Sequence, residues 1–177
     1  MTTSTFEPRQ EGAFSLVVGS SVAVGCKPLA PEGHGLERSV FRGEWALGST
    51  AAGCPNHANF QNNPQFRLSV SRRTDVLLRL RLADLASSGG RKAALGLDVY
   101  RREAVLGTDE ARGRTPATLT ANGGVYSYPP GGVLVPRTPL EAGSVYIVVV
   151  STFDPLPAAF ELICHAESGA VRVEKLR

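Results

Sequence analysis

The chain has 177 residues, of which 42% are apolar and 20% are charged, and its formal net charge is +3. A chain of this size and composition buries enough apolar surface to fold without metals or disulfides. Its three cysteines are widely spaced and odd in number, which excludes a disulfide framework and paired zinc knuckles and favours a reducing compartment.

Long apolar segments are missing from the sequence. No run of 18 apolar residues occurs, and the first 24 residues carry charges instead of a continuous apolar stretch. We therefore expect neither a membrane-spanning helix nor a secretory signal. The expected location is the cytoplasm, with peripheral attachment to membranes as the alternative.

Residues 4–18 and 151–164 repeat one pattern. Both begin with Ser-Thr-Phe, an acidic residue and proline, and both end in an apolar run that precedes a valine-rich segment. The copies start 147 residues apart (151 minus 4), which is about the length of one domain. We interpret residues 1–25 as the tail of a preceding domain, forming a strand pair from 13–18 and 21–24. Residues 26–36, with two prolines and two glycines, are the predicted linker.

The remainder, residues 37–177, carries short strand-like segments separated by turn residues. Apolar and polar side chains alternate in residues 66–70 and 76–82, which is typical of half-buried strands. Residues 145–150 are apolar on both faces and predict a central strand. Further strands are predicted at 39–45, 94–100, 124–128, 133–135, 159–164 and 170–176. The pattern predicts an all-β protein, an antiparallel two-sheet β-sandwich of about eight strands.

Positive charge is concentrated between Phe66 and Arg102, where nine basic residues and three aspartates give a net charge of +6. If the two alternating strands in this segment pair as a hairpin, their arginines share one solvent-facing surface. Such a surface attracts anionic lipid headgroups or an acidic protein segment. It lacks the interleaved aromatic residues of a nucleic-acid site. The candidate binding residues are Arg67, Arg72, Arg73, Arg79 and Arg81. A solvated strand face that discourages edge aggregation is the alternative interpretation.

An ordered series of motifs resembles calpain domain III, the C2-like domain that follows the protease core. The series runs through Glu44-Trp45, Asn63-Pro64-Gln65-Phe66, residues 95–100, residues 143–155 and Phe160-Glu161-Leu162. The resemblance covers residues 37–177 and implies a C2-like sandwich. The repeat at residues 4–18 matches the closing segment of the same family, and PalB-type atypical calpains carry two such domains in tandem.

The resemblance implies a noncatalytic regulatory and docking module of a calpain-like cysteine protease or of an inactive homologue. Its implied partners are the protease core or other domains of the parent protein, an acidic protein segment or anionic lipid, and not nucleic acid. Two alternatives stay open: the C-terminal fragment of an active calcium-dependent protease, and a stand-alone peripheral membrane module. The family's long acidic loop is replaced here by Ser71-Arg72-Arg73-Thr74-Asp75, which argues against a calcium role.

No catalytic residue is expected in this chain. Cys54 and His57 are close in sequence, but Cys54 belongs to a turn that matches the noncatalytic domain. We expect a buried thiol beside a loop histidine. Zinc binding by these two residues with Cys164 and His165 is disfavoured, because neighbouring residues of a strand point to opposite faces.

No cofactor is expected either. Calcium takes about six to eight oxygen ligands, whereas the five aspartates of this chain are widely dispersed. The best calcium candidates, all weak, are Asp109, Glu110 and Asp154. Turn capping and a solvated acidic pair are the simpler interpretation.

Overall fold

The computed structural model describes residues 12–13, 15–83, 93–102, 118–128 and 131–176. The chain divides into two units, Met1–Glu32 and Gly33–Arg177. Among the described residues, no helix has the length and apolar character needed to cross a membrane.

The described part of the first unit contains no strand. The described residues of the strand pair predicted at 13–18 and 21–24 are therefore not in strands. Large apolar side chains of this segment are exposed, including Val17 at 90% and Val22 at 70%. A two-stranded ribbon alone buries too little apolar surface to be stable in water. That residues 1–25 are the tail of a preceding domain stays a prediction.

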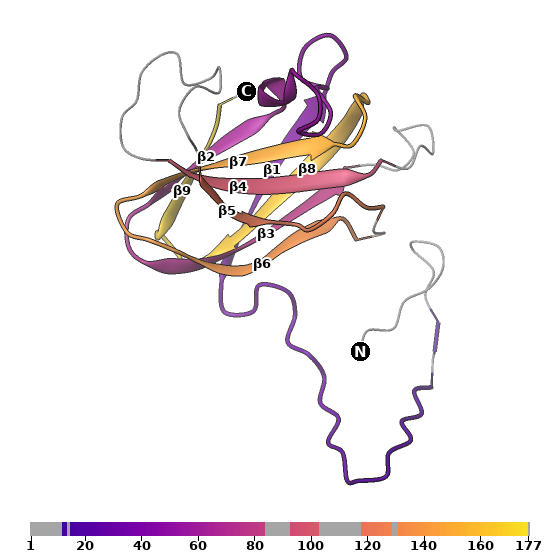
Figure 1. Ribbon diagram of the computed structural model, residues 1–177. Coiled ribbons are helices and arrows are strands. Elements are labelled where there is room, and N and C mark those ends of the chain that lie inside the picture. Colours follow the sequence, from indigo (N-terminus) through magenta and orange to yellow (C-terminus); the bar gives the residue numbers. More distant parts are fainter. Residues whose placement is uncertain (1–11, 14, 84–92, 103–117, 129–130, 177) are drawn as a thin grey trace. The chain divides into compact units, whose positions relative to one another are not determined.

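The described residues of the second unit form nine strands in two antiparallel sheets (Figure 1). Their bounds are β1 (Glu37–Trp45), β2 (Gln65–Val70), β3 (Thr74–Leu82), β4 (Leu95–Arg102), β5 (Thr118–Asn122), β6 (Val133–Leu140), β7 (Val145–Thr152), β8 (Ala158–Ala166) and β9 (Val171–Lys175). Sheet A has the order β1-β8-β3-β6, and sheet B has the order β5-β4-β7-β2-β9. A short 3-10 helix, Phe60–Asn62, lies between β1 and β2. The predicted all-β, two-sheet sandwich is confirmed.

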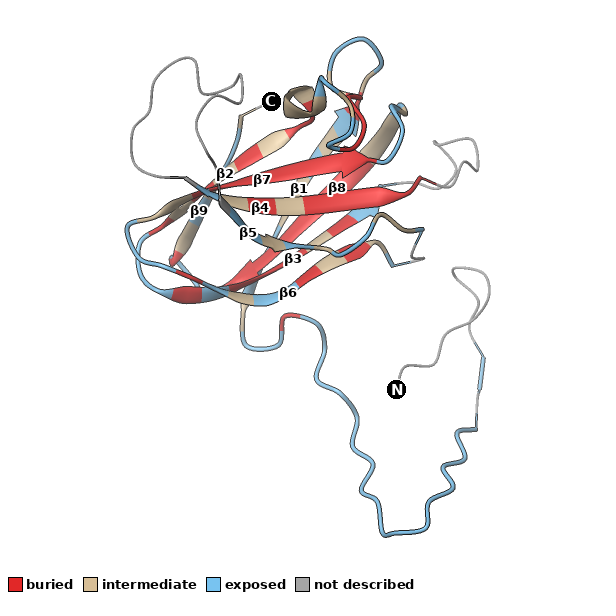
Figure 2. Ribbon diagram, in the orientation of Figure 1, coloured by how far each residue is buried: buried red, intermediate tan, exposed pale blue. Residues whose placement is uncertain are grey.

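The inner faces of the two sheets form one apolar core. Alternate residues of each strand enter it, as Phe66 and Leu68 of β2 do with no exposed surface. Trp45 packs on Phe160 with ring centroids 4.6 Å apart. The Trp45 indole N–H also donates to the Val150 carbonyl oxygen at 3.0 Å, which joins β1 of sheet A to β7 of sheet B. Figure 2 shows that burial is concentrated on the central strands β7 and β8.

Residues 66–70 and 76–82 do not pair as the hairpin that a shared arginine face would require. Strand β2 pairs with β7 and β9, whereas β3 pairs with β6 and β8. Residues 71–73 carry the chain from sheet B to sheet A. Both strands have one apolar face, and crossing between the sheets lets the two faces meet in the core. Alternation shows which side chains share a face, but not which strands pair.

The segment between β4 and β6 also differs from expectation. Residues 124–128, predicted as a strand, make only an isolated bridge between Ser127 and Leu95. The strand that the structure describes in this region is β5, which the sequence pattern did not indicate. Val125 is 86% exposed, so the apolar residues of 124–128 do not mark a buried strand face.

Candidate functional site

The five arginines of the predicted binding surface lie in three separate places. Arg67 belongs to β2 in sheet B, and Arg79 and Arg81 belong to β3 in sheet A. Arg72 and Arg73 lie in the loop that connects the two sheets. The prediction of one shared arginine face is therefore wrong, because it required β2 and β3 to be neighbours in one sheet.

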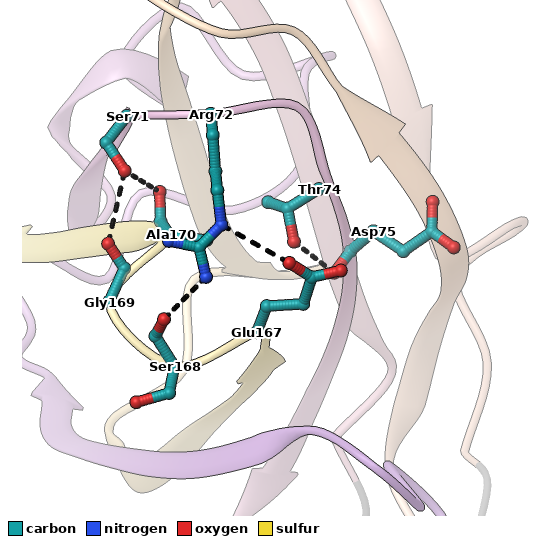
Figure 3. A network of polar contacts seen from close by, with 8 residues as sticks. All are labelled: Ser71, Arg72, Thr74, Asp75, Glu167, Ser168, Gly169 and Ala170. Atoms are coloured by element: carbon teal, nitrogen blue, oxygen red, sulfur yellow. Dashed lines mark hydrogen bonds and ion pairs between the residues drawn. The ribbon is translucent and has the colours of Figure 1, made fainter.

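Arg72 ties the β2–β3 loop to the β8–β9 loop (Figure 3). Its Nε lies 3.4 Å from the Glu167 carboxylate, and its Nη2 donates to the Ser168 carbonyl oxygen at 2.7 Å. The Ser71 hydroxyl donates to the Ala170 carbonyl oxygen at 3.1 Å. These contacts use donors of Arg72 to hold the two loops together, so its role in this structure is to order one end of the sandwich.

Arg73 and Arg67 form loose surface ion pairs. Arg73 Nε lies 3.8 Å from Glu141, and Arg67 Nη1 lies 3.5 Å from Glu174. Ion pairs of this length between solvated side chains contribute little to stability. Each pair is nearly neutral, so neither position presents a strong field to an anionic ligand.

Glu161 of β8 organises the outer face of sheet A. In the strand register it lies directly opposite Arg42 of β1 on one side and Arg81 of β3 on the other. Arg42 Nε donates to Glu161 Oε1 at 3.0 Å, and Arg81 Nε and Nη2 donate to Oε2 at 2.8 and 2.6 Å. We call this set of Arg42, Glu161 and Arg81 the arginine row.

The carboxylate of the arginine row is buried while its two guanidinium groups reach solvent. The side chain of Glu161 is 9% exposed, whereas those of Arg42 and Arg81 are 80% and 47% exposed. Hydrogen bonds from Arg81 and then Arg42 hold the pKa of Glu161 below its ordinary value, against the effect of burial. At neutral pH the row therefore has two positive charges, one negative charge and outward N–H donors.

Arg79 extends the positive charge along β3. It lies on the same face as Arg81, opposite Ile163 of β8, and its Nη1 donates to the Gly131 carbonyl oxygen at 2.7 Å. The outer face of sheet A thus brings Arg79 and Arg81 of the predicted set together. The other three members of that set lie elsewhere.

Sequence reasoning missed Arg42 and Glu161 as site residues. The signal for Glu161 was a single charge between Phe160 and Leu162 in an otherwise apolar strand. The signal for Arg42 was its outward place in the alternation of residues 39–45. Neither signal has meaning until the register places the two residues opposite each other.

Two of the three thiols are buried, and the expectation of a buried thiol at Cys54 is confirmed. Cys54 and Cys164 are each 3% exposed, and burial raises the pKa of Cys164 to about 12. His165 lies on the strand face opposite to that of Cys164, as predicted. It does not face solvent, however, because it is 5% exposed and packs against Gly33.

The metal-ligand candidates do not converge in the described part of the chain. Among those residues, no group of three or more His, Cys, Asp or Glu side chains could hold a metal ion. Asp154 is exposed, and its carbonyl oxygen accepts a hydrogen bond from the Thr152 hydroxyl at 2.6 Å. Asp109 and Glu110 lie outside the described residues.

An apolar hollow of about 470 Å³ lies beside the start of β4 and the end of β7. The rings of Tyr126 and Phe153 meet edge to face there, with centroids 5.7 Å apart. Its lining residues are Ala94, Val125, Tyr126, Tyr128 and Phe153. None of these described lining residues is charged and none belongs to the arginine row, so the hollow is a separate feature.

The sandwich and its motifs agree with comparisons to known proteins. Residues 41–162 match the family described as calpain large subunit, domain III. The chain is 28% identical over 151 residues to the calpain-like protease palB/RIM13 of Cryptococcus neoformans var. neoformans serotype D, a match that covers 85% of this chain and 17% of that protein. It is 28% identical over 159 residues to calpain-9 of Rattus norvegicus, covering 78% of this chain and 21% of that protein.

The chain therefore belongs to the calpain domain III family, which confirms the resemblance found in its motifs. It corresponds to about a fifth of the length of these relatives.

Proposed function

We propose that this domain is a noncatalytic regulatory and docking module of a calpain-type parent protein, and that its arginine row binds an acidic protein segment. The observation that carries the proposal is the buried Glu161 carboxylate holding Arg42 and Arg81 on one outer face. Such a module acts by binding a partner and by orienting the parent protein toward it, whether the parent is an active protease or an inactive homologue.

The state of the thiols supports a noncatalytic role. A cysteine nucleophile acts as the thiolate. With a pKa of about 12, Cys164 is protonated at neutral pH. Cys54 is buried, and its backbone N–H donates to the Phe153 carbonyl oxygen at 3.0 Å within the loop packing.

The geometry favours an acidic peptide over a membrane surface. Strands β1 and β3 flank β8, so their backbones are roughly 10 Å apart, and one extended peptide can reach both arginines. A guanidinium group binds a carboxylate in a planar, paired geometry. Binding to an anionic membrane gains about 1 kcal/mol for each basic residue near the membrane surface. Because the predicted arginines lie in three separate places, few of them can contribute to such binding at the same time.

Titration of the chain with a synthetic octaglutamate peptide tests the proposal. We expect binding that weakens when salt is raised from about 50 to about 300 mM. Arg42→Gln should weaken binding about fivefold, because it removes one exposed guanidinium while Arg81 still pairs with Glu161. Arg67→Gln on sheet B is the matched control and should have no effect.

Equal losses for the two variants would show that peptide binding follows net charge alone and would contradict the proposal. Failure to bind octaglutamate, together with salt-sensitive sedimentation on phosphatidylserine vesicles, would instead assign the face to membrane attachment.

A further inference from the structure

Strand β1 is the long unprotected edge of the described sandwich. It has nine residues and pairs with β8 along its whole length without a bulge, and no strand that the structure describes pairs with its other side. At the opposite edge of sheet A, β6 contains Pro136 and Pro139, which lack an N–H group. The edges of sheet B, β5 and β9, have only five residues each. An open edge of this length can pair with another strand.

Two hydrogen bonds show which backbone groups of β1 face the open side. The Glu44 carbonyl oxygen accepts from the Thr50 hydroxyl at 3.2 Å. Ala159, opposite Glu44 in β8, directs its own carbonyl oxygen to the N–H of Ala83 at 2.9 Å. In an antiparallel strand, the N–H and C=O groups of one residue point to the same neighbouring strand, and those of the next residue point to the opposite side. Glu44 and Ala159 thus direct their backbone groups away from each other, and those of Glu44 point to the open side of β1. The residues of β1 whose N–H and C=O groups face the open edge are therefore Arg38, Val40, Arg42 and Glu44.

The side chains of these four residues project from the outer face of sheet A, because Arg42 does so and the others follow it at a spacing of two. Arg38 and Glu44 are both exposed, and neither has an ion-pair partner in the described part of the chain. The strand therefore carries an unpaired positive charge near one end and an unpaired negative charge near the other.

This charge pattern makes β1 complementary to itself. If two copies pair in antiparallel orientation about Phe41, Arg38 lies opposite the partner's Glu44, and Val40 lies opposite the partner's Arg42. A two-residue shift in one direction places Arg38 opposite the partner's Arg42, and a shift in the other direction places Arg42 opposite the partner's Arg42. Both shifted registers oppose like charges, so the register centred on Phe41 is favoured.

We propose that two copies of this chain associate through their β1 strands, so that the two A sheets form one continuous sheet. On the inner face the same register brings Phe41 against the partner's Phe41. Phe41 is partly buried and packs on Phe66 with ring centroids 5.9 Å apart, so this contact extends the existing core. The Thr50 hydroxyl ends the new ladder at Glu44.

Sedimentation equilibrium of the 177-residue chain tests the pairing. The monomer mass is 18.7 kDa, and we expect the dimer to be populated at about 100 μM. Arg38→Glu places a second acid opposite the partner's Glu44 and should raise the dissociation constant at least about tenfold. The charge-swapped variant R38E/E44R should recover dimerisation, because each pair again joins opposite charges. Arg172→Glu on the exposed face of β9 is the matched control and should not change the mass.

A chain that stays monomeric at this concentration would overturn the proposal. So would association that R38E leaves unchanged, as expected if the exposed apolar residues of the first unit cause it, or a swapped variant as weak as R38E. The measurement contains no octaglutamate, so its outcome is independent of the proposed docking function.

Discussion

At the scale of single residues, the charge of Glu161 contributes to the stability of the fold through its ion pairs with Arg42 and Arg81. Replacing Glu161 by Gln keeps a hydrogen-bond acceptor but removes the charge between two guanidinium groups. We expect the free energy of unfolding to fall by about 1 kcal/mol, because Arg42 and Arg81 can be hydrated once released. Urea unfolding followed by Trp45 fluorescence measures this, and Glu174→Gln, with a 3.5 Å surface pair, is the control.

The contribution of Glu161 should depend on pH with a defined sign. Its pKa in the folded protein is lower than the ordinary value of 4.5, so protonation favours the unfolded chain. The stabilisation is complete above about pH 4.5 and is lost as the pH falls through the lowered pKa. The stability difference between the wild type and E161Q should therefore shrink in acid. A difference that grows as the pH falls would contradict this account of the arginine row.

Thiol reactivity tests the residue-scale description of the core. Cys26 is exposed, whereas Cys54 and Cys164 are buried. A thiol reagent such as dithionitrobenzoate at about pH 8 should label one cysteine rapidly in the native protein and all three in denaturant. Two or more rapid equivalents in the native protein would show that a buried thiol is accessible.

Residue-scale prediction from the sequence was good for side-chain direction and poor for pairing. Alternation correctly placed Phe66 and Leu68 in the core and left Arg79 and Arg81 on the outside. It could not place Arg42 next to Glu161, because these residues are 119 positions apart and meet only through the β1–β8 register.

At the scale of elements, Gly132 before β6 shows a constraint that only the backbone reveals. Its φ is +81°, and a Cβ atom there would overlap the Leu80 carbonyl oxygen. Gly132→Ala should cost about 2 kcal/mol more in unfolding free energy than Gly143→Ala, whose φ is +71° but whose Cβ would meet nothing within 4 Å. Equal losses in a denaturant titration would show that the overlap is relieved at no cost.

Most strands were predictable because each has one clearly apolar face. The exceptions have physical reasons. Strand β5 is a short edge strand whose Leu119 is 48% exposed, so it lacks an apolar signature. Residues 124–128 carry the aromatic residues of a strand, but Tyr126 uses its ring to cover Gly96 from outside the ladder. Amino-acid composition alone does not distinguish a loop whose aromatic side chain packs over a strand from a strand of the sheet.

At the scale of the whole molecule, the assignment of strands to sheets was the step that the sequence pattern could not supply. Charge counting predicted one positive face from β2 and β3, and the crossing at residues 71–73 divides it. Only the motif order, which resembles calpain domain III, carried information on topology. The exposed apolar side chains of residues 15–24 belong to a separate unit, and none of the described residues of that unit is in a strand.

The docking proposal is tested most directly by mapping amide chemical shifts of the ¹⁵N-labelled chain during an octaglutamate titration. We predict shifts centred on β1, β8 and β3 around Arg42, Glu161 and Arg81, with little change on β2 and β9. Shifts centred instead on the Arg72 loop of Figure 3 or on Arg67 of sheet B would contradict the assignment of the docking site to the outer face of sheet A.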